Sequence, residues 1–272
     1  MKLVTFSHPQ RTGVGILHDD SVTVTAWTGD LLSLLDAGIT PNETSIRFPL
    51  SSVKLRPPLR PRKIIAVGRN YAEHAKELGN TAPSAPLLFS KLPNSVIGTG
   101  DSITWSEAVT QQVDWEAELA VVIGKRAAQV SVEDAMKFVY GYTAANDITA
   151  RDLQETEPQW VRGKGMDTFC PLGPVIVTKN EIPDPHALSL TTTVNGETMQ
   201  NGNTGDMIHR VDALVSYISQ WITLEPGDVI LTGTPSGVGK GMKPPRFLKD
   251  GDVVAVTVEG IGTLTNPCKA RP

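Results

Sequence analysis

The stretch VDWEAELAVVIG (residues 113–124) and the later stretch YTAANDITARD (142–152) decide the fold, because both combine a buried-strand pattern with acidic side chains. Glu116 and Glu118 are two residues apart, so in an extended chain both carboxylates point to the same face. Like charges on a half-buried strand are costly to desolvate unless a cation neutralises them. With Asp147 they form an all-oxygen set that suits Mg²⁺, Mn²⁺ or Ca²⁺ and suits Zn²⁺ poorly. The three acids therefore predict a divalent-metal site.

An alternative explanation of the three acids needs no metal. Glu116 could face solvent on an edge strand, Glu118 could pair with a basic side chain, and Asp147 could begin a turn. The apolar flanks AVVIG and TAAN make simple exposure the weaker interpretation.

Length and composition describe one large globular domain, or a large domain with a small one attached. The chain has 272 residues, of which 40% are hydrophobic and 20% are charged. Its net charge of −4 argues against general nucleic-acid binding, which needs a basic surface. Cys170 and Cys268 show no C-x-x-C spacing, and no apolar run is long enough to cross a membrane. We therefore expect a cytoplasmic protein that binds neither nucleic acid nor membranes.

Proline, glycine and many short runs rich in Val, Ile and Thr predict a mainly β (α+β) protein with many turns. Residues 1–58 predict a small N-terminal α/β domain, in which Asp30 caps a short apolar helix. The proline-rich stretch 54–63 predicts a linker, and the catalytic unit is expected over 59–272. The longest predicted helix spans 207–222, where apolar residues recur at helical spacing.

His74 and Glu77 in NYAEHAKELG form a second candidate group. On a helix, residues three apart share a face, so the carboxylate can reach an imidazole nitrogen. A carboxylate that orients a histidine fixes its tautomer and raises its basicity, which suits activation of a water molecule. A chance pair on an exposed helix is the alternative, and the pair taken alone favours that alternative.

A polar string follows the second acidic stretch. RDLQ and VRGKG contain Arg151, Gln154, Arg162 and Lys164, all close to Asp147 in sequence. These side chains could be solvated loop charges. However, three carboxylates around one divalent ion leave a negative site, so an anionic substrate needs added positive charge and hydrogen-bond donors. Lys164 is placed to supply that charge.

The stretch LTGTPSGVGKGMKPP (231–245) superficially resembles a phosphate-binding loop but does not fit the pattern of one. Counting back from Gly239 and Lys240, the first glycine position holds Thr234, and Gly241 follows the lysine in place of Ser or Thr. Nucleotide binding is therefore not expected. A loop whose backbone N–H groups and Thr234 hydroxyl hold a substrate carboxylate fits the sequence better.

Together these motifs resemble the fumarylacetoacetate hydrolase superfamily, in its acylpyruvase and 2-hydroxyhepta-2,4-diene-1,7-dioate isomerase-like branch. The resemblance covers most of the chain, from about Lys63 to Asn266, through VGRNYAEHAKELG, PLLFSKLPNSVIGTGDSI, DWEAELAVVIGK, GYTAANDITARDLQ, GKGMDTFCPLGP, QNGNTGDMI, LEPGDVILTGTPSGVG and LKDGDVVAVTVEGIGTLTN. It implies the family's mixed β-sandwich roll, with a small N-terminal domain, and a homodimer.

The resemblance also implies roles for the metal and water-activating groups. Glu116, Glu118 and Asp147 match the family's metal ligands, which hold Mg²⁺ or Mn²⁺. His74 and Glu77 match the pair that activates water in the hydrolytic members. No ligand and neither member of the pair is missing, so an inactive relative is disfavoured.

Further residues match the substrate contacts of the family. Lys164 matches the lysine that contacts the substrate oxyanion, and Arg151 and Gln154 match polar residues near the substrate. Thr234 matches the contact to the substrate carboxylate.

The implied substrate is a small anionic 2-oxo acid. The first expectation is hydrolysis of a carbon–carbon bond in an acylpyruvate such as fumarylpyruvate or acetylpyruvate, because His74 and Glu77 are both present. The same site could decarboxylate oxaloacetate or isomerise a 2-hydroxy-dienedioate, and a non-catalytic acid-binding relative is a third alternative. The loops 80–86 and 155–163 are expected to select the substrate side chain.

Overall fold

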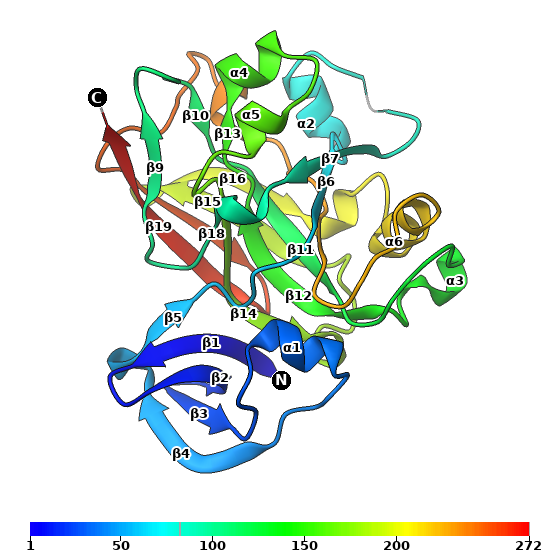
Figure 1. Cartoon of the computed structure of the whole chain (residues 1–272). Coiled ribbons are helices and arrows are strands. Elements are labelled where there is room, and N and C mark those ends of the chain that lie inside the picture. Colours follow the sequence, from blue (N-terminus) through cyan, green and yellow to red (C-terminus); the bar gives the residue numbers. More distant parts are fainter. Residues whose placement is uncertain (82, 272) are drawn as a thin grey trace.

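The computed structural model describes residues 1–81 and 83–271, and strands predominate in it (Figure 1). The strands are β1 (Lys2–His8), β2 (Arg11–His18), β3 (Ser21–Thr25), β4 (Glu43–Pro49), β5 (Lys54–Arg56), β6 (Ile64–Gly68), β7 (Leu87–Lys91), β8 (Val96–Ile97), β9 (Ile103–Ser106), β10 (Val113–Asp114), β11 (Ala117–Ile123), β12 (Val139–Asn146), β13 (Thr149–Ala150), β14 (Cys170–Thr178), β15 (Ser189–Val194), β16 (Glu197–Asn203), β17 (Val229–Leu231), β18 (Val253–Val258) and β19 (Gly262–Arg271). The α-helices are α1 (Leu31–Asp36), α2 (Ala72–Glu77), α3 (Val132–Ala135), α4 (Arg151–Thr156), α5 (Val161–Lys164) and α6 (Val211–Ser219). The predicted mainly β class is confirmed.

Most strands join one large sheet with the order β4-β3-β2-β1-β14-β12-β11-β17-β6-β7, in which β5 also pairs with β1 and β8 with β14. A smaller sheet has the order β16-β15-β18-β19-β9, and β10 pairs with β13. Contacts of β11 with β15 and β18 join the two sheets, so β11 and β12 lie in the middle of the molecule (Figure 1).

Strand β11 is buried along its whole length, because apolar layers cover both of its faces. Leu119 and Val121 pack toward Val256 of the smaller sheet in one core. Ala120 and Val122 pack in a second core, which also contains the buried leucines of α1. Burial on both faces explains the unbroken apolar run that follows the two glutamates in the sequence.

The N-terminal strands continue the large sheet, because β1 pairs with β14. Helix α1 begins after Asp30, whose carboxylate accepts a hydrogen bond from the Ser33 N–H, so the predicted cap is confirmed. The predicted linker 54–63 is wrong for its first three residues, which form β5 and pair with β1. They precede the prolines and therefore keep the N–H groups that pairing needs. A domain boundary at residue 58 stays a prediction.

The predicted helix 207–222 is shorter in the structure, where α6 covers only its middle. The residues before it are not helical: Met207 forms an isolated bridge with Tyr71, and the Ile208 N–H donates to the Asn70 carbonyl at 2.8 Å. His186 Nε2 then accepts the Val211 N–H at 3.0 Å and fixes the start of the helix. Within the described residues, no helix has the length and apolar character needed to span a bilayer.

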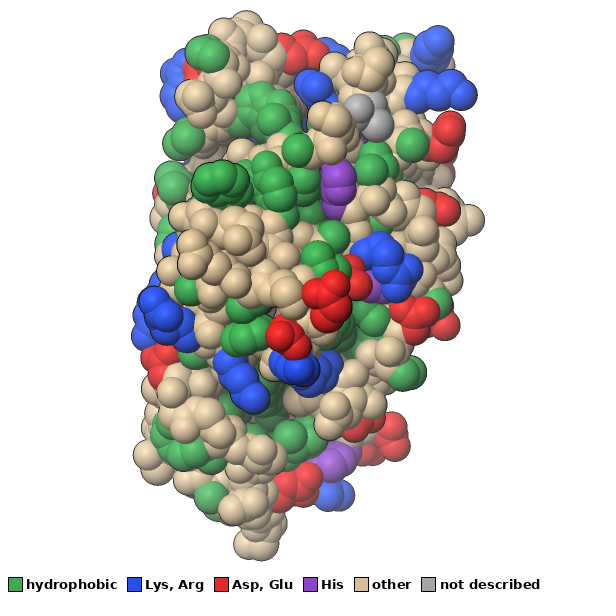
Figure 2. Space-filling model, turned by 90° about the vertical axis from the view of Figure 1, so that its right-hand side faces the viewer, with side chains coloured by type: hydrophobic (Ala, Val, Ile, Leu, Met, Phe, Trp, Pro, Cys, Tyr) green, Lys and Arg blue, Asp and Glu red, His purple; other side chains and the backbone are tan. Residues whose placement is uncertain are grey.

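The face of the molecule shown in Figure 2 lies to the right in Figure 1. On this face the Lys and Arg side chains of the described residues are scattered among acidic and apolar ones, without a continuous basic surface. Such a distribution offers no electrostatic attraction for a nucleic-acid backbone on this side.

Candidate active site

Glu116, Glu118 and Asp147 lie together at the ends of two paired strands. Glu118 belongs to β11, Glu116 precedes that strand, and Asp147 follows β12. Because Ala117 pairs with Asn146, these strand ends meet, and the Asp147 N–H donates to the Glu116 carbonyl at 2.9 Å. A carboxylate oxygen from each acid lies within 4.8 Å of those from the other two, and all three side chains are buried. The fold therefore assembles the acidic group that the sequence predicted.

Two buried cations neutralise Glu116. Lys164 Nζ lies 2.7 Å from Glu116 Oε2 and 2.8 Å from Asp147 Oδ2. Arg151 Nη1 lies 2.7 Å from Glu116 Oε1. Burial raises the pKa of Glu116, but the charges of Lys164 and Arg151 outweigh burial and lower it to about 2. Glu116 is therefore ionised in the folded protein at neutral pH.

Glu118 differs from its two neighbours, because it makes no ion pair within the described part of the chain. Its Oε2 accepts a hydrogen bond from the Gly233 N–H at 2.7 Å. Burial raises the pKa of Glu118 well above its usual range, and the charges of Asp147 and Glu116 raise it further.

The three acids fit a hard divalent cation. Such a cation would neutralise Glu118, and Mg²⁺ and Mn²⁺ prefer carboxylate oxygens of this kind. Each carboxylate oxygen has two lone pairs, so an oxygen that accepts one N–H can still bind a metal. The all-oxygen set, and the lack of a basic partner for Glu118 in the described part of the chain, therefore support the expected Mg²⁺ or Mn²⁺ site.

His74 and Glu77 lie on helix α2, which follows β6. The His74 side chain is buried, and its Nδ1 lies 3.4 Å from Glu77 Oε2. Glu77 Oε1 accepts a hydrogen bond from the Gly237 N–H at 2.9 Å, so the carboxylate is held from a second side. A proton on Nδ1 that faces the carboxylate leaves Nε2 free to act as a base. The structure therefore disfavours a chance pair on an exposed helix.

The glycine-rich loop after β17 uses its backbone to hold acids of this chain. Four of its N–H groups donate to carboxylates: Gly233 to Glu118, Gly237 to Glu77, and Gly239 and Lys240 to Asp114. The expectation that the loop N–H groups hold a substrate carboxylate is therefore wrong for these four. The buried Thr234 side chain lines the cavity, and its Oγ1 accepts from Gln200 Nε2 at 2.8 Å. Its own hydroxyl hydrogen is thus left for a ligand.

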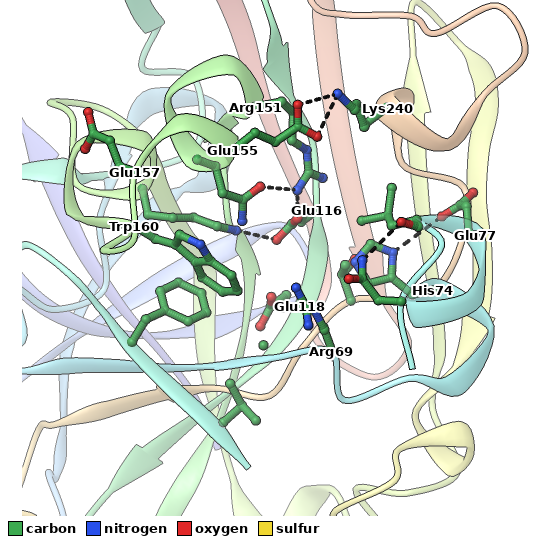
Figure 3. A pocket seen from close by; sticks show the side chains of 18 of the residues that line it. Arg69, His74, Glu77, Glu116, Glu118, Arg151, Glu155, Glu157, Trp160 and Lys240 are labelled. Carbon is green, nitrogen blue, oxygen red and sulfur yellow. Dashed lines mark hydrogen bonds and ion pairs between the residues drawn. The ribbon is translucent and has the colours of Figure 1, made fainter. Parts of the chain in front are cut away.

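The candidate groups other than Asp147 line one cavity of about 640 Å³. In Figure 3 the side chains of His74 and Glu77 lie on one side of this cavity, Trp160 lies on the other, and Glu116 and Glu118 lie between them. The cavity therefore brings Glu116 and Glu118, the histidine pair and the basic side chains to one volume, and Asp147 adjoins it through its contact with Lys164.

The two loops expected to select the substrate contribute unequally to the cavity. From 155–163 the cavity is lined by Glu155, Glu157, Pro158 and Trp160. From 80–86 it is lined by Asn80, and residue 82 lies outside the described residues.

Gln154 also lines the cavity and accepts a hydrogen bond from Arg151 Nη1 at 3.0 Å. Arg162 is exposed and pairs with Glu157, so it is the solvated loop charge of the polar string.

Sequence reasoning missed two wholly buried charges at the site. Lys91, at the end of β7, has its Nζ 2.7 Å from Asp147 Oδ1 and donates to the Ile148 carbonyl at 2.9 Å. Asp114 Oδ2 accepts from Arg151 Nε at 2.8 Å. A signal existed for each, because Lys91 closes an apolar strand pattern and Asp114 stands two residues before Glu116 on the same alternation.

Comparisons with known proteins agree with this geometry. Residues 63–269 match the family model described as fumarylacetoacetate (FAA) hydrolase C-terminal, and residues 1–58 match the one described as Rv2993c-like, N-terminal. Oxaloacetate tautomerase YisK of Bacillus subtilis is 50% identical over 226 residues, which are 82% of this chain and 75% of that protein. The mitochondrial oxaloacetate tautomerase FAHD2A of Homo sapiens is 48% identical over 214 residues, 78% of this chain and 68% of that protein.

Solved structures also match the whole chain, among them the following two. A fumarylacetoacetate hydrolase from Exiguobacterium antarcticum is 41% identical, with a TM-score of 0.92 and complete coverage of both chains. A 2-hydroxyhepta-2,4-diene-1,7-dioate isomerase from Mycobacterium marinum is 38% identical, with a TM-score of 0.86 over 100% of this chain and 99% of that chain.

Proposed function

This chain belongs to the fumarylacetoacetate hydrolase family, and we propose that it is a divalent-metal-dependent enzyme that interconverts the enol and keto forms of oxaloacetate or a related 2-oxo acid. The observation that carries the proposal is the buried trio Glu116, Glu118 and Asp147 with Lys164 bound to two of its members. Relatives that are 48–50% identical to this chain over the matched residues are named oxaloacetate tautomerases.

The acidic trio and its cations suit a reaction that develops negative charge on oxygen. Glu116, Glu118 and Asp147 would hold Mg²⁺ or Mn²⁺, which when bound supplies a Lewis acid for that charge. Lys164 places a second positive charge at the same point, fixed by its two carboxylate partners. Burial of the ammonium group strengthens its effect on a nearby anion, because water does not screen it.

The histidine pair suits the proton transfer. Conversion of an enol to its keto form removes the proton from the enol oxygen and adds one to the neighbouring carbon. His74 Nε2 can carry that proton, because Glu77 holds the other ring nitrogen. Gly237 fixes Glu77 in turn, so the imidazole keeps one orientation toward the cavity.

A second candidate function, hydrolysis of an acylpyruvate, is favoured by the same buried pair. His74 would take a proton from water, which attacks the distal carbonyl, and Lys164 would stabilise the oxyanion that forms. The carbon–carbon bond then breaks to give a carboxylic acid and the enolate of a 2-oxo acid. Decarboxylation of oxaloacetate gives an enolate of the same kind without the attacking water.

A panel of substrates separates these reactions. EDTA-treated protein, with and without added Mg²⁺ or Mn²⁺, is assayed on enol-oxaloacetate, acetylpyruvate, fumarylpyruvate and a 2-hydroxy-dienedioate. The proposal expects metal-dependent loss of the enol absorbance of oxaloacetate without release of CO₂. If an acylpyruvate alone is cleaved with metal present, the enzyme is a hydrolase and the tautomerase proposal is wrong. Release of CO₂ from oxaloacetate would instead indicate a decarboxylase, and turnover of the dienedioate alone would indicate an isomerase.

Paired variants of helix α2 test the role of the histidine pair. Glu77→Gln removes the carboxylate that orients His74, and we expect a loss of kcat of about 100-fold, in the usual range for general acid–base catalysis. Glu73→Gln is the matched control, because Glu73 lies on the same helix with an exposed side chain. Equal rates in the two variants would show that Glu77 does not assist His74 in the reaction.

A homodimer and a cytoplasmic location stay predictions. Light scattering coupled to size-exclusion chromatography measures the first, because a dimer has twice the 29.2 kDa mass of the chain.

A further inference from the structure

The cavity contains basic side chains that differ in whether they already have an acidic partner. Three of them bind carboxylates of this chain: Arg151 binds Asp114 and Glu116, Lys164 binds Glu116 and Asp147, and Lys240 binds Glu155. Arg69 also lines the cavity. Among the residues that the structure describes, no acidic partner and no side-chain hydrogen bond are found for Arg69. Its guanidinium group is therefore available to an anionic ligand.

The backbone of Arg69 supports a role in ligand binding. Its φ angle is +59°, in the left-handed region that L side chains seldom occupy. Such strain persists only where the surrounding structure imposes it, and it is concentrated at functional sites. Arg69 lies between β6 and α2. The residue with the strained backbone is therefore one whose charged side chain lines the cavity.

The neighbours of Arg69 impose this conformation. The buried Asn70 side chain donates to the carbonyl groups of His209 and Thr232 at 3.0 and 2.8 Å, and accepts from the His209 N–H at 2.8 Å. On the other side, Gly68 ends β6 and pairs with Leu87 of β7. With both neighbours fixed, the chain at Arg69 is held in place before any ligand binds.

Figure 3 shows where the free charge lies. In this view the Arg69 side chain is drawn between those of Glu118 and His74, which also line the cavity. A substrate whose 2-oxo acid end lies at the acidic trio would therefore extend across the region of Arg69. The planar guanidinium group can bind a carboxylate through two parallel N–H bonds, which a lysine cannot do.

We propose that Arg69 binds the second carboxylate of the substrate and makes this enzyme selective for 2-oxo dicarboxylic acids over 2-oxo monocarboxylic acids. This inference rests on the proposed function, because it assumes that the acidic trio receives the 2-oxo acid end. Loss of Arg69 removes a two-bond contact to a carboxylate, which a monocarboxylic acid never makes. The effect of its removal is therefore specific to dicarboxylic substrates.

Exchange of the C3 hydrogens with deuterated water, followed by proton NMR, measures enolisation of both substrate classes. Oxaloacetate and 2-oxobutanoate are the matched pair, since a carboxylate in one replaces a methyl group in the other. Arg69→Asn removes the guanidinium group, and asparagine tolerates positive φ. We expect kcat/KM for oxaloacetate to fall about 100-fold and that for 2-oxobutanoate to change less than about threefold, as expected for loss of charged hydrogen bonds.

Two further variants separate charge from geometry. Arg69→Lys keeps the charge without the planar group, so its oxaloacetate rate should lie between those of the wild-type protein and Arg69→Asn. Arg60→Gln is the control for loss of one positive charge, because Arg60 is exposed and outside the cavity lining. Equal losses on both substrates in Arg69→Asn, an unchanged oxaloacetate rate, or a wild-type protein without preference for oxaloacetate would overturn the proposal.

A binding measurement keeps this test independent of turnover. If the wild-type protein exchanges neither substrate, the proposed function fails, and calorimetry with Mn²⁺-loaded protein decides the role of Arg69. The probes are 2-oxoglutarate and 2-oxopentanoate, which again differ by one carboxylate. Tighter binding of 2-oxoglutarate by the wild-type protein that disappears in Arg69→Asn supports the assignment. The same preference in both proteins, or none in the wild-type protein, overturns it.

Discussion

Asp114 links Arg151 to the glycine-rich loop, so Asp114→Asn should weaken the contacts of both and lower the stability of the protein. The carboxylate is wholly buried and accepts four hydrogen bonds. Oδ1 accepts from the N–H groups of Trp115 at 2.8 Å and Gly239 at 2.7 Å. Oδ2 accepts from Arg151 Nε at 2.8 Å and from the Lys240 N–H at 3.0 Å. Each oxygen therefore faces two donors.

The magnitude follows from this arrangement. An asparagine amide has only one oxygen, so in either orientation its NH₂ group faces two N–H donors. The substitution also removes the negative charge that faces the buried Arg151 guanidinium. Breaking one partner of a buried ion pair costs about 3–5 kcal/mol, against a total stability of about 5–15 kcal/mol for a typical domain.

Equilibrium unfolding in urea of the metal-free proteins measures this loss. Asp152→Asn is the matched control, because Asp152 also accepts hydrogen bonds, from Thr110 and Gln111, but is partly exposed. We expect the control to lose less than about 1 kcal/mol. A loss in Asp114→Asn no larger than that of the control would refute the reasoning, since Asp114 would then not hold the site together.

Three further predictions follow from other contacts. Gly237→Ala should lower the melting temperature and kcat. A Cβ atom at this position would lie 2.2 Å from a carbonyl oxygen and would displace the N–H that holds Glu77. An unchanged melting temperature and kcat would contradict this prediction. Lys91→Met removes a buried cation from Asp147, so the free energy of unfolding in urea with EDTA should fall by about 3 kcal/mol. The same variant should bind Mn²⁺ more tightly, and weaker Mn²⁺ binding would contradict this prediction. Burial, with a contribution from a nearby arginine, lowers the pKa of His186 below its usual 6.5, so stability should be full above pH 6.5 and decline as pH falls below it. His186→Gln should flatten this decline in the urea midpoint, and an equal slope in both proteins would exclude His186 as its source.

The pair Glu116 and Glu118 could be predicted from sequence because its geometry depends on local features, whereas Asp147 joins the pair through the pairing of β11 with β12. Glu116 and Glu118 share a face through strand alternation, and an apolar flank marked the strand as buried. The pair His74 and Glu77 could be predicted for the same reason, since one helical turn brings the two side chains together. In each case the spacing along the chain fixes the relative position of the two side chains.

Other parts of the site depend on contacts between distant segments. Lys91 reaches Asp147 only because β7 lies beside β6 in the large sheet, and no local pattern encodes that neighbourhood. The start of α6 depends on His186, which accepts the Val211 N–H, and on the Asn70 carbonyl, which binds the Ile208 N–H. That Arg69 has no acidic partner among the described residues is likewise known only once the partners of the cavity side chains are placed.

Titration of EDTA-treated protein with Mn²⁺, followed by electron paramagnetic resonance, tests the metal site most directly. The wild-type protein and Glu118→Gln are compared, because Glu118 is the acid without a cationic partner in the described residues. We expect a single Mn²⁺ per wild-type chain and an Mn²⁺ affinity more than about 100-fold lower in the variant. Loss of a residue that only supports a metal ligand costs about 10- to 100-fold in affinity, so a larger loss indicates a direct ligand. Equal affinity in the two proteins, or no Mn²⁺ bound by the wild-type protein, would contradict the assignment of the trio as the metal site.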